Sequence, residues 1–172
     1  MQELPHTRSC FVCGESNPSG LKLIFHTDGK IVEARFTPAP DHIGFRETVH
    51  GGILATVLDE IMVWACAVQT KQWAYCAEFT VRFIQPAKPG EMIRATAELA
   101  ENRRNKIFEA KGELRTADGV LLASASGKYL PLKPNLAQDM LGDLIGDTSA
   151  ITGAATATRT CVSEDLPDRK IL

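Results

Sequence analysis

This 172-residue sequence has no excess of positive charge: its 19 Lys and Arg residues are outnumbered by 21 Asp and Glu residues, and the formal net charge is −2. Proteins that hold nucleic acids or anionic membranes through phosphate groups carry a basic field. We therefore expect neither a nucleic-acid partner nor a membrane partner. The length and the 44% hydrophobic content indicate one globular domain with its own core.

The sequence also lacks an even set of cysteines, a secretion signal and an apolar run long enough to span a bilayer. Five cysteines favour free thiols in a reducing compartment. Residues 1–8 are acidic and polar, unlike the start of a signal peptide. The apolar residues 53–68 are interrupted by Asp59 and Glu60 and fall short of about 20 residues. These features predict a cytoplasmic protein with a core helix.

Apolar residues alternate with polar ones in several segments, which is typical of half-buried strands. An Asp28-Gly29 turn predicts a first hairpin, and a helix over residues 53–68 precedes further strands. Small residues on the strands leave room for a helix close to the sheet. The predicted strands are residues 21–26, 32–36, 78–83, 93–99, 108–115 and a last strand that ends near Tyr129; the small residues are Ala95, Ala97, Ala110, Gly112, Ala123 and Ala125. The fold class expected is α+β, an antiparallel curved sheet around one long central helix.

Four parts are expected along the chain. Residues 1–20 form an N-terminal segment with a Cys-x-x-Cys motif, and residues 21–131 form the domain. A short amphipathic helix capped by Asn135 is predicted within residues 132–146. Residues 147–172 lack periodicity and are predicted to be a flexible tail.

The predicted central helix has almost no polar face. One broad apolar face should meet the sheet, and the opposite face carries small residues together with Asp59 and Cys66. Because a thin domain offers no second layer, a second copy of the chain is the expected cover, giving a homodimer. Asp59 would then be an ionised carboxylate buried away from water, which costs free energy unless the group has a function. The alternative is that Asp59 lies at a hydrated edge or pairs with an arginine. Glu60 lies nearer the sheet side, which favours a structural ion pair over the role of working acid.

His50, Gly51 and Gly52 precede this helix, so backbone amides without bulky side chains lie at a positive dipole end. Such amides stabilise an oxyanion. The alternative is that the glycines make only a tight turn and that His50 caps the helix.

Three motifs resemble the hotdog-fold acyl-CoA thioesterases of the phenylacetate-pathway type, within the hydroxybenzoyl-CoA thioesterase superfamily. They are Cys10-Phe-Val-Cys13-Gly-x-x-Asn17-Pro18-x-Gly20-Leu21, Val49-His50-Gly51-Gly52 followed by Asp59-Glu60, and Phe83-Ile-Gln-Pro86-Ala87-Lys88-Pro-Gly90. The resemblance implies dimers, with dimers of dimers as a further option, and active sites at the subunit interface.

The same resemblance implies hydrolysis of an acyl-CoA thioester with no cofactor, since coenzyme A is part of the substrate. Gly51 would polarise the thioester carbonyl beside His50, and Asp59 of the facing subunit would act as general base or nucleophile. The substrate-binding residues expected are Gly52, Glu60, Cys76, Arg103 and Arg104. The loop ahead of His50 departs from the family pattern, because it holds His42, Gly44 and Arg46 where relatives often place an amide side chain.

The sequence admits three other interpretations. A non-catalytic acyl-CoA-binding module would gain little from a buried acid, and the loop expected of a hotdog dehydratase is not matched around His42 or His50. Cys10 and Cys13, with His6, supply half the ligands of a structural zinc site, and no second pair follows. We therefore expect no metal site, and packing of the two cysteines beneath the helix.

Overall fold

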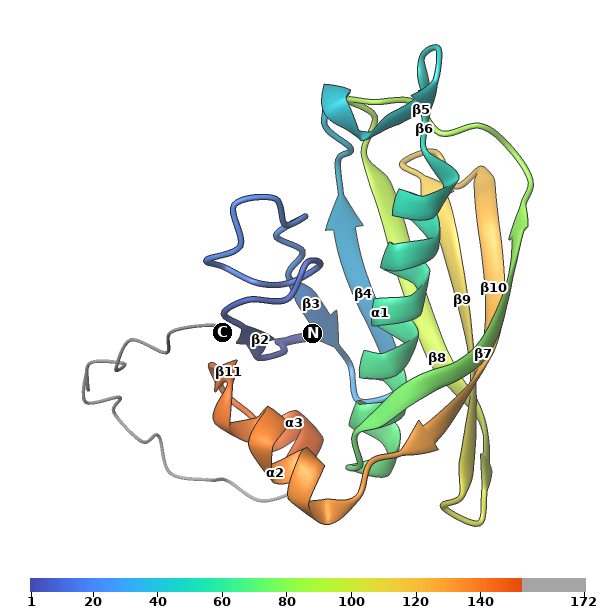
Figure 1. Cartoon of the computed structure of the whole chain (residues 1–172). Helices are drawn as coiled ribbons and strands as arrows, with labels where there is room; N and C mark the ends of the chain where they lie inside the picture. Colours follow the sequence, from blue (N-terminus) through green and yellow to red (C-terminus); the bar gives the residue numbers. More distant parts are fainter. Residues whose placement is uncertain (153–172) are drawn as a thin grey trace, which may run out of the picture.

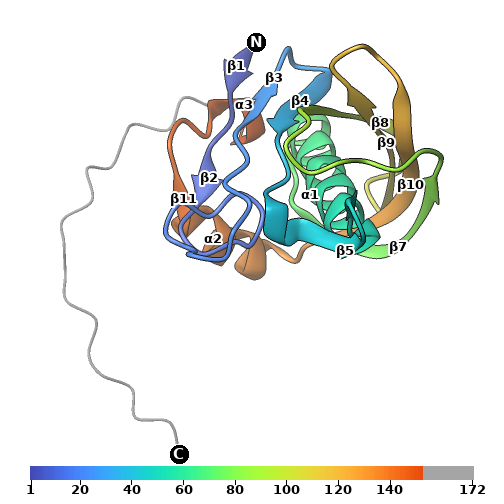
Figure 2. The ribbon, with the colours of Figure 1, turned by 90° about the horizontal axis from the view of Figure 1, so that it is seen from above.

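A seven-stranded antiparallel sheet with the strand order β1-β3-β4-β8-β9-β10-β7 forms the body of the protein. The structure, a computed structural model, describes residues 1–152. The sheet strands are β1 (Gln2–Glu3), β3 (Phe25–Thr27), β4 (Ile31–Phe36), β7 (Ala74–Phe83), β8 (Ile93–Arg103), β9 (Ile107–Thr116) and β10 (Leu121–Pro131). The sheet curves around one long helix, α1 (Gly51–Thr70), as seen from the side in Figure 1 and from above in Figure 2. The predicted α+β arrangement is confirmed.

Helix α1 fits closely against the sheet because the facing strand residues are small. The predicted inward residues Ala95, Ala110 and Ala123 are fully buried. At Gly112 a Cβ atom would lie 3.2 Å from Leu58 and 3.3 Å from Met62, so glycine permits the close approach. α1 is long and apolar enough by composition to cross a membrane, but most of it is buried in the chain, as in a core helix.

The first predicted strand is shorter than expected. Only Phe25–Thr27 pair with β4, through the predicted turn in which Gly29 has a φ of 94°. The preceding residues instead bind the N-terminal segment: the amides of Leu21 and Leu23 donate to the carbonyls of Phe11 and Val12 at 2.8 and 2.9 Å. The backbone hydrogen bonds of this stretch are therefore satisfied by a loop.

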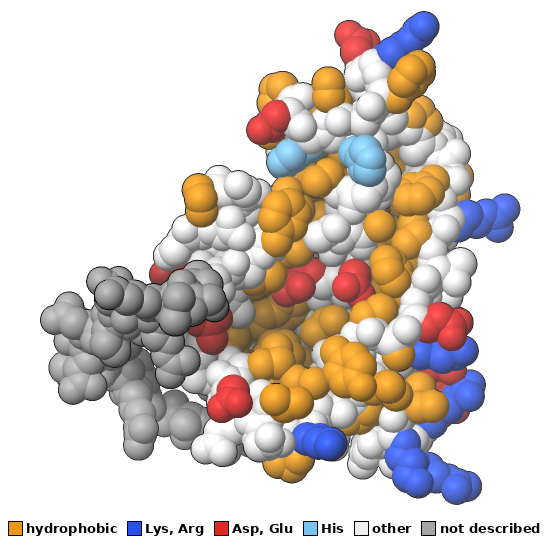
Figure 3. Space-filling model, viewed as in Figure 1, with side chains coloured by type: hydrophobic (Ala, Val, Ile, Leu, Met, Phe, Trp, Pro, Cys, Tyr) orange, Lys and Arg blue, Asp and Glu red, His pale blue; other side chains and the backbone are white. Residues whose placement is uncertain are grey.

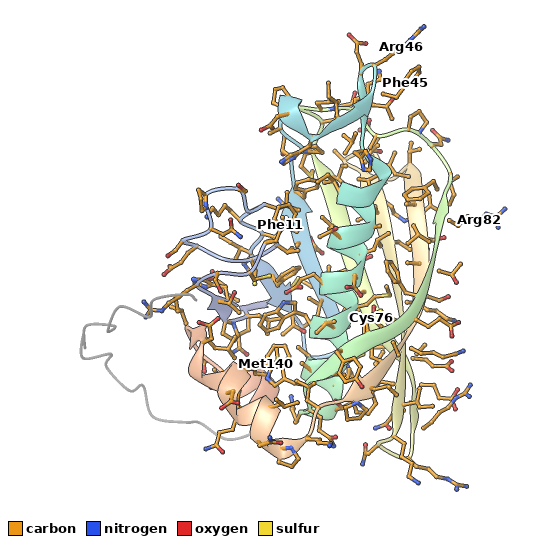
Figure 4. The ribbon with its side chains drawn as sticks, viewed as in Figure 1. Phe11, Phe45, Arg46, Cys76, Arg82 and Met140 are labelled. Carbon is orange, nitrogen blue, oxygen red and sulfur yellow. The ribbon has the colours of Figure 1, made fainter. Side chains whose placement is uncertain are left out.

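The loop between β4 and α1 contains a short 3₁₀ helix, η1 (Pro40–His42), and a small hairpin. Its strands are β5 (Ile43–Phe45) and β6 (Thr48–Val49). The tip of this hairpin carries Phe45 and Arg46, which project from the end of the molecule beyond the start of α1 (Figure 4).

The N-terminal segment and residues 134–152 cover part of α1, where only a second copy of the chain was expected as the cover. The N-terminal segment with β2 (His6–Thr7) lies alongside α1, together with α2 (Pro134–Gly142), β11 (Leu144–Ile145) and α3 (Ser149–Thr152). β11 pairs with β2.

Two expectations about the C-terminal part are wrong. Lys133, not Asn135, is the N-cap of α2, because Pro134 takes the first helical position, where its fixed φ and missing N–H are tolerated. Residues 147–152 are not a flexible tail: Ile151 is only 3% exposed, and Lys71 Nζ donates to the Ala150 carbonyl at 2.6 Å. The rest of the predicted tail lies outside the described residues.

Candidate active site

The start of α1 presents one backbone amide that has no hydrogen-bond partner among the described residues. His50 is the N-cap, and its Nδ1 accepts a hydrogen bond from the Gly52 amide at 2.8 Å. The carbonyl of His50 accepts from Ile53 at 2.9 Å. Among residues 1–152, no acceptor faces the Gly51 amide. The capping interpretation of His50 is therefore confirmed, and of the two glycines it is Gly51 that has a free N–H at the positive end of the helix dipole.

Gly51 lines a pocket of about 290 Å³ between the helix start and the segment that follows β7. A Cβ atom at Gly51 would lie 3.2 Å from Cζ of Phe83, so any larger residue would crowd the aromatic ring. The pocket is largely apolar and is lined by Thr48, Val49, Gly51, Leu54, Phe83, Ile84, Gln85, Pro86 and Ala87. A free amide in an apolar pocket is suited to hold a carbonyl oxygen.

Asp59 is half-buried near the middle of α1. The hydroxyl of Tyr129, a fully buried residue of β10, donates to Asp59 Oδ1 at 3.2 Å. Burial raises the pKa of Tyr129 well above its usual range, and the negative charge of Asp59 raises it further, so the phenol remains a donor. Acidic side chains are visible over α1 among hydrophobic ones (Figure 3).

Cys76 of β7 is beside Asp59, as expected for a residue near the site. It stands opposite Tyr129 in the pairing of β7 with β10, and its thiol interacts with both Asp59 and Tyr129. Burial, followed by the charge of Asp59, raises the pKa of Cys76 to about 11, so the thiol is protonated at neutral pH. In Figure 4 its side chain lies between β7 and α1.

The Gly51 amide and the Asp59 carboxylate of one chain are too far apart to act on one carbonyl group. They are eight residues apart on a helix that rises about 1.5 Å per residue, or about 12 Å along the axis. A shared substrate therefore requires the two groups to come from different chains.

Glu60 lies at a different place from the one predicted. Its Oε1 accepts from Trp64 Nε1 at 3.0 Å and lies 3.8 Å from the sulfur atoms of both Cys10 and Cys13. Burial, followed by the charge of Cys10, raises the pKa of Glu60 to about 7. No Lys or Arg of the described chain pairs with Glu60, so the expected ion pair is absent from residues 1–152.

The other cysteines are placed by the packing around the helix. Cys66 is fully buried within one chain, where a second copy was the expected cover. Cys13 is buried and Cys10 is half-buried, and both contact Glu60 at the flank of α1. The cause is that the N-terminal segment covers this side of the helix.

Arg103 and Arg104 lie in the turn between β8 and β9, at the end of the sheet opposite the start of α1 (Figure 1). Arg103 is paired with Glu101 at 3.3 Å and with Glu109 at 2.8 Å. Within one chain this turn is remote from Gly51, and contact of the two arginines with substrate stays a prediction.

Tyr129 is the site residue that the sequence analysis missed. It is 70 positions from Asp59 and carries no motif. The only available signal was its place at the end of the last predicted strand, and the pairing partner of that strand could not be read from periodicity.

Comparison with known proteins finds similar sequences and similar folds. The sequence profile of the Thioesterase superfamily matches residues 47–123, which include Gly51 and Asp59. The Caenorhabditis elegans protein named "Putative esterase F42H10.6" is 31% identical over 101 residues, or 56% of this chain. The chain spans 59% of the length of that relative.

Solved structures show the same fold. The thioesterase superfamily protein RHA08564 is 26% identical, with a TM-score of 0.66 over 72% of this chain and 60% of its own. The Escherichia coli PaaI protein from the phenylacetic acid degradation operon is 20% identical, with a TM-score of 0.60 over 66% of this chain and 81% of its own. Smu.793 from Streptococcus mutans, solved bound to acetyl CoA, is 14% identical, with a TM-score of 0.58 over 63% of this chain and 86% of its own.

The chain thus has a hotdog fold, a curved antiparallel sheet around a central helix, and is similar in sequence to the Thioesterase superfamily over residues 47–123. Within that class, the predicted resemblance to hotdog thioesterases of the PaaI type is confirmed.

Proposed function

We propose that this protein hydrolyses a coenzyme A thioester to a free acid and coenzyme A. The observation that carries the proposal is the free Gly51 amide in an apolar pocket, together with Asp59, half-buried near the middle of the same helix. The match to the Thioesterase superfamily and the acetyl CoA bound to a protein of the same fold support this class of substrate.

The Gly51 amide would donate a hydrogen bond to the thioester oxygen, on which negative charge develops. It is aimed outward from the first turn of α1, where the helix dipole also favours negative charge. A preorganised donor of this kind typically contributes about 2.7–4 kcal/mol to transition-state stabilisation. The apolar residues around Gly51 strengthen the effect by excluding water.

Asp59 would supply the attacking oxygen in one of two ways. As a general base it removes a proton from water, whose oxygen attacks the carbonyl carbon while the carbon–sulfur bond breaks and coenzyme A leaves as a thiolate. As a nucleophile its own oxygen attacks, and water then hydrolyses the acyl-aspartate anhydride. In either case Tyr129 positions the carboxylate by donating to Oδ1, which leaves Oδ2 for the reaction.

The 12 Å rise between Gly51 and Asp59 favours an active site shared by two chains. β7 is an edge strand of the sheet, so its outer backbone groups have no strand partner among the described residues. Exposed apolar side chains follow this edge, with Tyr75 at one end and Phe83 and Ile84 at the other. A twofold dimer that pairs two β7 edges would cover them and bring α1 of each chain near the other, and a dimer of dimers extends the same proposal.

The direct test is thioester hydrolysis by Asp59→Asn, measured as free-thiol release over a panel of short, long and aromatic acyl-CoAs. Asparagine keeps the shape and can still accept from Tyr129, but it is neither a base nor a nucleophile, so turnover should fall at least about a hundredfold. Asp118→Asn, in an exposed turn, is the matched control and should behave like the wild type. Normal turnover by Asp59→Asn would refute the assignment, and binding of acyl-CoA without turnover by the wild type would instead support a binding module.

Single turnover in ¹⁸O-labelled water separates the two roles of Asp59. With enzyme in excess of substrate, label in the Asp59 carboxylate and an unlabelled first acid product identify a nucleophilic Asp59 whose anhydride is attacked by water at the aspartyl carbon. A general base gives a labelled acid and an unlabelled enzyme.

A further inference from the structure

Cys10, Cys13 and Glu60 form a cluster that the proposed reaction does not use. The two sulfur atoms and a carboxylate oxygen all lie within 4.8 Å of one another. Each sulfur is 3.8 Å from Glu60 Oε1. The residues come from two distant parts of the chain, the N-terminal segment and the middle of α1, so the fold itself brings them together. In Figure 4, Phe11, which lies between the two cysteines in sequence, marks this segment alongside α1.

The loop that carries the two cysteines is held in a fixed shape. The Gly14 amide donates to the Cys10 carbonyl at 2.9 Å, and a Cβ atom at Gly14 would lie only 2.3 Å from that oxygen, so no other residue fits. Lys22 Nζ donates to the carbonyls of Gly14 at 2.9 Å and Glu15 at 2.7 Å. The positions of both sulfur atoms are therefore set by the backbone before any ligand arrives.

Each of the three side chains also contacts a polar group outside the cluster. The Val12 amide donates to Cys10 Sγ at 3.2 Å, and Thr7 Oγ1 lies 3.8 Å from Cys13 Sγ. Trp64 Nε1 donates to Glu60 Oε1 at 3.0 Å. Partners of this kind orient the ligands of metal sites and are a regular part of them.

The sulfur–oxygen separations are close to those in a tetrahedral zinc site. With Zn–S bonds of about 2.3 Å and Zn–O bonds of about 2.1 Å, tetrahedral angles put sulfur and oxygen about 3.6 Å apart and two sulfurs about 3.8 Å apart. The observed sulfur–oxygen distances of 3.8 Å need little adjustment. Two thiolates and one carboxylate suit Zn²⁺ and exclude a hard cation such as Mg²⁺ or Ca²⁺, which takes oxygen ligands alone.

We propose that Cys10, Cys13 and Glu60 bind one Zn²⁺ ion that fastens the N-terminal segment to α1. Two Zn–S bonds and one Zn–O bond form, the protons of the thiols pass to solvent, and water completes the tetrahedron. Half-buried Cys10 provides the path by which the ion enters. The sequence analysis expected no metal because it sought a second Cys or His pair, whereas the third ligand here is a lone glutamate about fifty positions away.

The test uses the full chain, stripped with a chelator and kept reduced. Zn²⁺ is titrated by competition with a chromophoric chelator, and Co²⁺ serves as a spectroscopic probe. We expect one Zn²⁺ per chain, a higher Tm with Zn²⁺ but not with Mg²⁺, and Co²⁺ spectra with a thiolate charge-transfer band and intense tetrahedral d–d bands.

Two variants locate the site. Glu60→Gln is nearly isosteric and keeps an acceptor for Trp64, so it should fold. Its Zn²⁺ affinity should fall at least about tenfold, because even loss of a group that only hydrogen-bonds a metal ligand typically lowers affinity by that factor. Cys13→Ser should lose the charge-transfer intensity of one thiolate. Cys76→Ser and Glu15→Gln are the matched thiol and carboxylate controls, and both should bind Zn²⁺ like the wild type.

The proposal is overturned if the reduced wild-type protein binds neither metal. It is also overturned if folded Glu60→Gln retains wild-type affinity and Tm shift, or if the controls lose binding as the ligand variants do. None of these outcomes depends on thioester hydrolysis, so the metal site and the proposed activity fail or stand separately.

Discussion

Gly51→Pro is the substitution that isolates the oxyanion donor, because it deletes the free amide and leaves the helix start intact. Proline is favoured at the first position of a helix, where its fixed φ suits the chain and its missing N–H has no helical partner. The residue before it, His50, has φ −60° and ψ 130°, which is the extended conformation that a following proline requires. The fold should therefore survive, with a gain of roughly 0.4–1 kcal/mol from the stiffer unfolded chain.

The catalytic cost follows from the role of the amide. Removing one oxyanion donor costs about 2.7–4 kcal/mol, so kcat for thioester hydrolysis should fall about 100- to 1,000-fold. The matched control is Gly51→Ala, which adds the same Cβ atom 3.2 Å from Phe83 but keeps the N–H. Phe83 is 53% exposed and its ring has room to shift, so Gly51→Ala should fold normally.

The measurement is kcat and KM for both variants by free-thiol release, with Tm recorded beside them. Both variants share the Cβ atom near Phe83, so the ratio of the two kcat values reports the loss of the N–H together with the proline ring carbons that take its place. A Gly51→Pro enzyme that works as fast as Gly51→Ala would refute the assignment of this amide to the oxyanion.

Two further outcomes follow from the packing. Tyr129→Phe removes the hydroxyl that donates to Asp59, so kcat should fall about tenfold with KM little changed. The free energy of unfolding should fall by about 0.5–1.5 kcal/mol, the contribution of one hydrogen bond. An unchanged kcat would show that the hydroxyl does not position the carboxylate. Ile151→Ala should lower the free energy of unfolding by roughly 2–4 kcal/mol in a denaturant titration, because Ile151 belongs to the core; a loss below about 0.5 kcal/mol would place the C-terminal segment outside the folded domain.

The sheet and the helix could be predicted because their signals are local. Alternation marked the strands, Asp28-Gly29 marked a turn, and Gly29 does adopt a positive φ. The small residues that face α1 were readable as a close-packing surface, and Gly112 against Leu58 and Met62 shows why. The helix was predicted over residues 53–68, and α1 extends two residues further at each end, from Gly51 to Thr70.

The remaining features depend on contacts between distant residues. Which of the two glycine amides is free depends on His50 Nδ1, whose choice of Gly52 is a matter of side-chain geometry. Glu60 was predicted to lie on the sheet side of the helix and to form an ion pair there. Its carboxylate instead contacts Cys10 and Cys13 of the N-terminal segment, which the helix periodicity alone does not reveal. Residues 147–152 lack periodicity, yet one buried isoleucine is enough to dock them.

Subunit complementation tests the shared active site most directly. Asp59→Asn and Gly51→Pro chains are each inactive alone and are refolded together in equal amounts, which makes about half of the dimers mixed. If the amide and the carboxylate come from different chains, each mixed dimer has one intact site and one doubly damaged site, and activity returns to about a quarter of the wild-type value. Formation of mixed dimers without any recovery of activity would show that each site is built within one chain.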